Sequence, residues 1–219
     1  MSEWDFVKLG SLAHFKNGLN FSKDSWGKGI KIIGVSDFKD YLYPRYETLA
    51  EINPNGVVRK GNYLEEDDIL FVRSNGNRLL ISRSLHIKTL TDKVSHSGFT
   101  IRLRFTSSSV YVPFYVHLLR SSLIRSTLSL HGGGTNINNL NQEILSDLAV
   151  PVPQLSTQKR IAAVLSAYDD PTKITIDASL YSKKRQRKST ANGLSVCASH
   201  DTSKPRFTKV SPKVGKLKI

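Results

Sequence analysis

The segment GFTIRLRF at residues 98–105 restricts the fold most strongly, because its apolar and polar side chains alternate without interruption. Residues two apart along a β-strand share a face, so the pattern predicts a strand with one face in the core and the other in solvent. The apolar face consists of Phe99, Ile101, Leu103 and Phe105, and the polar face of Thr100, Arg102 and Arg104. Such a strand needs neighbouring strands.

Three further segments have the composition of strands. Asp68–Ser74 (DILFVRS) is apolar at its centre and lies between an acidic cluster, residues 65–68, and turn residues 74–77. Leu79–Ile87 (LLISRSLHI) predicts the next strand, with Arg83 inside its apolar stripe. Either a bulge or a side chain that reaches solvent accommodates Arg83, or Arg83 lies at a sheet edge for a purpose. The third segment, KIIGV from Lys31, follows the polar, glycine-punctuated loop KDSWGKG.

Apolar residues recur at helical spacing in two places. Residues 113–130 predict one broken helix or two short ones. Residues 156–169 predict another helix, with Ser156 as its N-cap and Pro171 just beyond its end. On this helix Gln158, Lys159 and Ser166 fall outside the apolar face, which consists of Ile161, Ala162, Leu165 and Tyr168. Together these elements predict a mixed α/β (α+β) fold with a small, twisted, mostly antiparallel sheet and flanking helices.

Basic residues are concentrated at the C-terminal end of the chain, whose net charge is +14. Residues 1–170 contain 20 Lys and Arg against 16 Asp and Glu, a net +4, whereas residues 171–219 contain 12 against 2, a net +10. The run KKRQRK at residues 183–188 lies among apolar residues of no steady period, so we expect a largely disordered tail. The charge suggests a polyanionic partner. We divide the chain into residues 1–150, 151–170 and 171–219.

Composition also narrows the class of protein. A single cysteine, Cys197, excludes a disulfide framework and a cysteine-based zinc site within one chain. No segment approaches the ~20 apolar residues of a membrane span, and the N-terminus has no signal-peptide pattern. We therefore expect a cytoplasmic protein with no membrane partner.

The motifs of common enzyme classes are absent from the sequence. The chain has no G-x-x-x-x-G-K-[ST] phosphate loop, no G-x-S-x-G elbow and no H-E-x-x-H metal motif. INPN at residues 52–55 lacks the second proline and the aromatic residue of an adenine-methyltransferase element and predicts an ordinary turn. The histidines are dispersed, and the acidic residues 65–68 are more typical of a charged turn than of a magnesium site. We expect no catalytic centre and no metal.

Seven segments in a fixed order resemble one half of the DNA-specificity subunit of type I restriction-modification enzymes. They are WDFVKLG at Trp4, FKNGLNF at Phe15, IGVSDF at Ile33, YLEEDDILFVRSNGN at Tyr63, SGFTIR at Ser97, GGGTNINNLNQ at Gly132 and VPVPQLSTQKRIAAVL at Val150. The resemblance covers about residues 3–170. It implies a target recognition domain of mixed α/β structure followed by the start of a long helix, which in the family packs antiparallel against a second helix as a spacer.

The resemblance implies that the chain is not an enzyme and reads one half of a two-part site in double-stranded DNA. Partner subunits for methylation and for restriction with translocation would use S-adenosylmethionine, ATP and magnesium, while this chain would hold no cofactor. The helix would supply a subunit interface to a second half-subunit or to another copy of the chain, as a homodimer. The candidate interface residues are Ile161, Ala162, Leu165 and Tyr168.

Candidate DNA-binding residues lie in turns rich in Arg and Asn beside the expected sheet, because Arg can read guanine and Asn adenine. They are Lys28, Arg73, Asn75, Asn77, Arg78 and Arg83. The glycine-rich stretch adds Gly133, Gly134, Thr135 and Asn136, whose backbone N–H groups could hold a phosphate. Turn chemistry and surface charge are the alternative for the side chains, and a tight connector is the alternative for the glycines. We expect Asn141 to cap a short helix after this stretch.

The sequence departs from the family pattern after Asp170. Pro171 interrupts the helix, and residues 171–219 match nothing in the pattern, as in a truncated or frame-shifted product. Two hypotheses follow. The chain is either a DNA-recognition module that directs methylation and restriction subunits, or a truncated stand-alone DNA-binding or interaction protein that no longer assembles with them.

Overall fold

The computed structural model describes residues 4–39, 41–74, 81–131 and 140–169 of the 219-residue chain, apart from the side chains of residues 129–131. All of them belong to one compact unit, Met1–Pro171. The helices are α1 (Val112–Arg120), α2 (Ser122–His131), α3 (Gln142–Asp147) and α4 (Leu155–Asp169). The strands are β1 (Phe6–Lys8), β2 (Ala13–Asn17), β3 (Trp26–Ile33), β4 (Ala50–Ile52), β5 (Ile69–Val72), β6 (Ser84–His86), β7 (Val94–His96), β8 (Thr100–Phe105) and β9 (Ala149–Pro151). The basic tail predicted at residues 171–219 lies outside the described residues.

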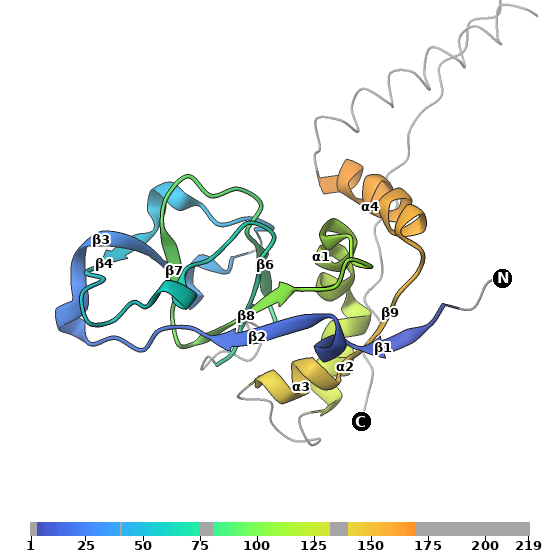
Figure 1. The fold of residues 1–219 in the computed structure, drawn as a ribbon, viewed down its shortest axis with the longest axis horizontal. Coiled ribbons are helices and arrows are strands. Elements are labelled where there is room, and N and C mark those ends of the chain that lie inside the picture. Colours follow the sequence, from blue (N-terminus) through green and yellow to red (C-terminus); the bar gives the residue numbers. More distant parts are fainter. Residues whose placement is uncertain (1–3, 40, 75–80, 132–139, 170–219) are drawn as a thin grey trace, which may run out of the picture. The chain divides into compact units, whose positions relative to one another are not determined.

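The described strands form three sheets (Figure 1). One sheet has the order β2, β8, β5, β6 and is antiparallel throughout. In the second, β3 pairs antiparallel with β4 and parallel with β7, and the third is the antiparallel pair β1 and β9. The helices gather at the same end as β1 and β9, and the antiparallel pair β2 and β8 lies between that end and the sheet of β3, β4 and β7 (Figure 1). The mixed α+β class predicted from the sequence is confirmed, while a coiled coil formed by α4 stays a prediction.

The predicted strand at residues 98–105 is confirmed as β8, which lies between β2 and β5. Its Ile101 and Leu103 are fully buried in the main core, which they share with residues of α1 and α3. The predicted exposure was wrong in two respects. Phe99 precedes the strand and is 64% exposed, whereas Thr100 and Arg102 are buried. Thr100 and Arg102 are buried because β8 is covered on both faces. Residues distant in the sequence cover the face that we expected to contact solvent.

β5 is confirmed within the segment that starts at Asp68, and the strand predicted at residues 79–87 is confirmed in part as β6, while residues 79–80 lie outside the described residues. β6 is the edge strand of its sheet, and backbone hydrogen bonds continue on either side of it, from the Val72 amide to the Arg83 carbonyl at 2.9 Å and from the Ile87 amide to the Asp68 carbonyl at 2.8 Å. Ser82 has a φ of 64°, a left-handed conformation that turns the chain and interrupts the alternation. Arg83 therefore lies directly before an edge strand, as one of the two interpretations supposed.

β3 begins at Trp26, five residues before the predicted strand KIIGV, so the end of the predicted polar loop belongs to the sheet. The pairing with β4 is irregular there, because Trp26 and Ile30 both lie opposite Ile52. The residues between them, Gly27–Gly29, form a bulge. The correction matters for Lys28, which lies on this bulge and not on a free loop.

The helices mostly follow their sequence signals. Residues 113–130 form two short helices, α1 and α2, and the side chain of Asn141 caps α3 by accepting a 2.7 Å hydrogen bond from the Ile144 amide, as predicted. The Tyr115 hydroxyl donates to the Pro151 carbonyl at 3.0 Å and joins α1 to β9. α4 begins at Leu155, so Ser156 is its second residue and not its N-cap. Within the described ranges, none of the helices has the length and apolar character needed to cross a membrane.

Gln158 of α4 is fully buried, which corrects its predicted place outside the packed face. Its Oε1 atom accepts a hydrogen bond from the Tyr111 amide at 2.8 Å, and its Nε2 atom donates to the carbonyls of Ser109 and Pro153, each at 2.8 Å. These three bonds satisfy the amide without water. They hold α4 against the segment that leads into α1.

Candidate nucleic-acid interface

Arg73, the first basic residue of the predicted reading turn, directly follows β5. Its amide donates to the Phe99 carbonyl at 2.8 Å, and its guanidinium donates through Nη1 to the Gly98 carbonyl at 3.3 Å. These bonds fix the start of the turn against the residues that precede β8. Asn75, Asn77 and Arg78 lie outside the described residues, and their DNA contacts stay a prediction.

The predicted glycine-rich segment rejoins the described fold at the same point. Leu140 directly follows residues 132–139, and its amide donates a 2.7 Å hydrogen bond to the Arg73 carbonyl. The Leu140 side chain is fully buried in the main core, so this junction is firmly held. Gly133, Gly134, Thr135 and Asn136 themselves lie outside the described residues. Two segments predicted separately from the sequence are thus anchored to each other at their ends.

Lys28 lies exposed on the bulge of β3. The next residue, Gly29, donates from its amide to the Glu51 carboxylate at 3.1 Å, which fixes the C-terminal end of the bulge. The Lys28 ammonium is therefore presented to solvent from a short segment of the sheet that is anchored on its β4 side.

Arg83 lies opposite Val72, the residue before Arg73, because the Val72 amide donates to the Arg83 carbonyl at 2.9 Å. Its Nη1 atom donates to the Phe38 carbonyl at 3.4 Å. With Lys39, Arg120 and Arg125 it lines a hollow of about 60 Å³. Arg83 thus belongs to a second basic region and does not line the larger pocket described below.

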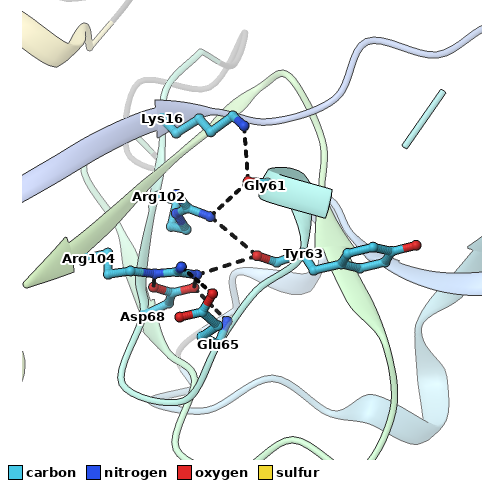
Figure 2. A network of polar contacts seen from close by, with 7 residues as sticks. All are labelled: Lys16, Gly61, Tyr63, Glu65, Asp68, Arg102 and Arg104. Carbon is cyan, nitrogen blue, oxygen red and sulfur yellow. Dashed lines mark hydrogen bonds and ion pairs between the residues drawn. The ribbon is translucent and has the colours of Figure 1, made fainter. Parts of the chain in front are cut away.

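A network of charged side chains covers the second face of β8 (Figure 2). Lys16 of β2 donates to the Gly61 carbonyl at 3.0 Å, and Arg102 of β8 donates to the carbonyls of Gly61 and Tyr63, each at 3.3 Å. Arg104 reaches the same Tyr63 carbonyl at 3.4 Å. Three cations from two adjacent strands therefore hold the chain around residues 61–63 against the sheet.

Asp68 neutralises part of this charge. It is fully buried, and Arg104 binds it with two hydrogen bonds of 2.7 Å, from Nε to Oδ1 and from Nη2 to Oδ2 (Figure 2). Glu65 forms a further ion pair with Arg104. The hydrogen bonds that Arg104 donates to Asp68 raise the pKa of Arg104, whereas burial lowers the pKa of Arg102. Charge-assisted bidentate pairs of this kind are stronger than hydrogen bonds between neutral groups.

His96 lies near the cationic side of the network and is neutral. It is 1% exposed, and burial, with smaller effects from Arg102 and Lys16, lowers its pKa to about 3. Thr100 donates from its hydroxyl to the Ser97 carbonyl at 2.7 Å, so we assign the proton of His96 to Nδ1, which donates to the Thr100 hydroxyl at 2.8 Å. A buried imidazole without charge avoids repulsion with the neighbouring cations.

The network positions two cations that our sequence analysis missed. Arg59 and Lys60 are exposed and lie just before Gly61, whose carbonyl receives two of the hydrogen bonds described above. The sequence signal was a basic pair directly before a glycine, in the stretch VVRKGNY. Within the residues that the structure describes, no group of three or more His, Cys, Asp and Glu side chains could hold a metal ion.

A pocket of about 530 Å³ lies between β3 and the residues that precede β8. Trp26, next to the bulge that carries Lys28, lines it on one side, and Gly98 and Phe99, which bind Arg73, line it on another. Neither Lys28 nor Arg73 lines this cavity, but Lys28 lies two residues from Trp26, and Arg73 is hydrogen-bonded to Gly98 and Phe99. The pocket itself had no counterpart in the sequence analysis, because its walls come from five separate segments.

The predicted interface on α4 divides into an inner and an outer part. Ala162 is 2% exposed and Ile161 packs against the main core, so both contribute to the domain itself. Leu165 and Tyr168 are 39% and 70% exposed, and Val164 adds a further exposed apolar side chain. The outer residues remain free to contact another helix, and the interface stays a prediction.

Comparison with known sequences identifies one matching family and similar proteins. The family model for the type I restriction modification DNA specificity domain matches residues 1–180. The type I restriction enzyme EcoKI specificity subunit of Escherichia coli (strain K12) is 29% identical over 143 residues, which is 64% of this chain and 30% of that protein. The StySPI specificity subunit of Salmonella potsdam is 29% identical over 128 residues, 57% of this chain and 27% of that protein. The chain spans about three tenths of the length of these relatives.

Solved structures show the same fold. The crystal structure of a type I restriction-modification S subunit from M. genitalium has a TM-score of 0.54 at 17% identity and covers 86% of this chain and 44% of that chain. The HsdS subunit from Thermoanaerobacter tengcongensis has a TM-score of 0.55 at 18% identity, over 84% of this chain and 39% of that chain. At these identities the likeness concerns the fold alone.

Proposed function

The chain belongs to the family of type I restriction modification DNA specificity domains, and from this membership we propose that it recognises one half of a two-part site in double-stranded DNA. The observation that carries the proposal is the family match over residues 1–180, which includes the whole described fold. The family is one of specificity and not of catalysis, so the chain is a non-catalytic component. We assign it no cofactor of its own.

The geometry around Arg73 supports a reading role. Readout of bases requires side chains on a rigid support, with further contacts to phosphates that set the register on the duplex. Arg73 leaves a buried strand and is bonded to the backbone of Gly98, Phe99 and Leu140. Arg73, Asn75, Asn77 and Arg78 are the candidate readers in the major groove, where Arg pairs with guanine and Asn with adenine. Lys28, Arg83 and residues 133–136 are the candidates for further contacts, including those to phosphates.

We propose that the outer residues of α4 bind a second helix. Val164, Leu165 and Tyr168 are exposed along its C-terminal half, and an exposed apolar stripe on a helix favours contact with a partner. The partner would be a second half-subunit or another copy of this chain. A methylation subunit and a restriction subunit would complete the assembly and would bring the chemistry that needs S-adenosylmethionine, ATP and magnesium.

Mapping of methylated sites tests this function directly. The chain is expressed with the methylation subunit encoded beside it in cells that lack other methyltransferases, and modified bases are located across the genome. The expected result is one two-part methylated sequence that disappears when this chain is omitted. If no mark appears and the two proteins do not co-purify, although the purified chain still binds DNA, the stand-alone alternative replaces the proposal.

A further inference from the structure

The pocket between β3 and the residues that precede β8 is lined by three aromatic side chains. Phe21, Trp26 and Phe99 line it, and Phe21 and Trp26 meet edge to face with ring centroids 5.2 Å apart. Trp26 is 51% exposed and Phe99 is 64% exposed. Large aromatic side chains left open to solvent around a concavity are typical of surfaces that receive an apolar or planar group. The pocket volume of about 530 Å³ lies within the ~300–1,000 Å³ usual for small-ligand sites.

The remaining walls add polar groups in the manner of a specific site. Asn20, Ser36 and Thr48 line the pocket and supply both hydrogen-bond donors and acceptors. Asp37 also lines it, with Oδ2 accepting a 2.8 Å hydrogen bond from the Gly34 amide. A planar ligand that carries its own donors and acceptors along one edge would match this combination of walls better than a purely apolar ligand would.

The charges at the border of the pocket favour an anionic chain outside it. Lys23 lines the pocket, Lys28 lies two residues from Trp26, and Arg73 is bonded to Gly98 and Phe99 in the wall. A ligand with a planar aromatic part and a negatively charged backbone is a nucleotide. Stacking on aromatic side chains and contact of phosphates with cations are the two usual means by which proteins hold an unpaired base.

We propose that this pocket receives one nucleobase, unstacked from the bound duplex, between Phe99 and Trp26. The inference rests on the proposed function, since it assigns a place to one base of the DNA that the chain recognises. Removal of a base from the stack costs free energy, and the cost is least where the base is mispaired. Insertion of the base therefore makes the affinity of the chain for DNA depend on whether the base at one position of the site is paired. This dependence is separate from the base readout proposed for Arg73 and the residues that follow it.

The test uses the full chain and a duplex that the purified chain selects from a random-sequence library. A mismatch is placed at each position in turn, and then an abasic residue at each position, and dissociation constants are measured for the wild type and for Phe99→Ala. Phe6→Ala is the matched control, because Phe6 is 65% exposed and lies on β1, which contributes nothing to the pocket. Thermal melting confirms that both variants fold.

One position is expected to behave differently from the rest. At that position, a mismatch tightens binding of the duplex to the wild type, and an abasic residue weakens this binding roughly 5- to 100-fold. The Phe99→Ala variant binds the intact duplex more weakly than the wild type does, by a similar factor. Its affinity does not change further when the abasic residue is introduced. Phe6→Ala binds as the wild type does. Base insertion would be overturned if Phe99→Ala and Phe6→Ala had equal affinities. It would also be overturned if the loss of affinity in Phe99→Ala were the same for every abasic duplex. Either result would leave the proposed DNA recognition intact. Failure of the wild type to select any duplex would overturn both.

Discussion

The amide of Leu140 donates a 2.7 Å hydrogen bond to the carbonyl of Arg73, across 67 positions of the sequence. Arg73 precedes the predicted turn that contains Asn75, Asn77 and Arg78, and Leu140 follows the three consecutive glycines in the glycine-rich stretch. A contact at one end of each segment means that both leave the folded sheet from one place. If both segments bind DNA as predicted, this bond sets the start of one beside the end of the other.

The glycine-rich stretch can be tested with Gly133→Val. If the backbone there approaches a phosphate, a branched side chain blocks the approach, and DNA affinity falls while the melting temperature stays the same. Affinity is measured by fluorescence anisotropy with a duplex that the wild type binds. Unchanged affinity supports the alternative, in which the glycines form a tight connector without a ligand.

Arg78→Ala distinguishes base readout from phosphate contact. If Arg78 reads a base, the substitution costs ~1–3 kcal/mol of binding free energy on the preferred site and relaxes the preference at one position. Binding of a library with every single base-pair change measures both effects. Arg160→Ala, an exposed arginine on α4, is the control and should change neither. An equal loss on all sequences would reassign Arg78 to the phosphate backbone.

Gln158 should contribute strongly to stability. Gln158→Leu keeps most of the side-chain volume but leaves the Tyr111 amide and the carbonyls of Ser109 and Pro153 without their partner in a buried place. We expect the free energy of unfolding in urea to fall by roughly 2–4 kcal/mol, because each unsatisfied buried group costs ~1–3 kcal/mol before relaxation. Arg160→Leu on the exposed side of the same helix should change it by less than ~0.5 kcal/mol. Equal effects of the two variants would contradict this account.

The pair of Arg104 and Asp68 should show strong coupling. Arg104→Met leaves the Asp68 carboxylate buried without its bidentate partner, and removal of one member of such a pair typically costs ~3–5 kcal/mol. The double variant Arg104→Met with Asp68→Leu removes both charges, so it should be less destabilised than the sum of the two single variants. Urea denaturation of the four proteins gives the coupling. Additive losses would show that the two side chains stabilise the fold independently.

Because His96 is neutral in the folded state, we expect the folded protein to lose stability in mild acid. The folded state keeps the imidazole neutral down to about pH 3, since its pKa is lowered to about 3 from the ordinary 6.5. Between these values the unfolded chain binds a proton that the folded chain does not, so stability falls as the pH falls. The slope from this residue approaches ~1.4 kcal/mol per pH unit.

The variant His96→Asn is the control for this pH dependence of the unfolding free energy. Its side-chain amide can replace Nδ1 as the donor to Thr100 and does not titrate. The difference in unfolding free energy between wild type and variant should shrink as the pH is lowered from 7 to 4. A constant difference across this range would mean that His96 is not held neutral.

Local patterns in the sequence were sufficient for the elements whose signals lie within a few residues. The alternation at residues 98–105 predicted β8, the helical spacing at residues 113–130 predicted one broken helix or two short ones, and Asn141 was recognised as a cap. Period and capping are properties of neighbouring residues, so one sequence contains them completely. The family, too, was recognised from the order of short motifs along the chain.

Only the tertiary structure decided which polar residues are buried and which distant segments meet. Arg102 and Arg104 looked like a solvent face, because the carbonyls and the carboxylate that receive them come from residues 61–68, more than 30 positions earlier. Gln158 looked like a surface residue because its partners include the segment before α1. Burial of a polar side chain depends on whether a matching group is brought to it, and that is decided by chain packing and not by the identity of its neighbours in sequence.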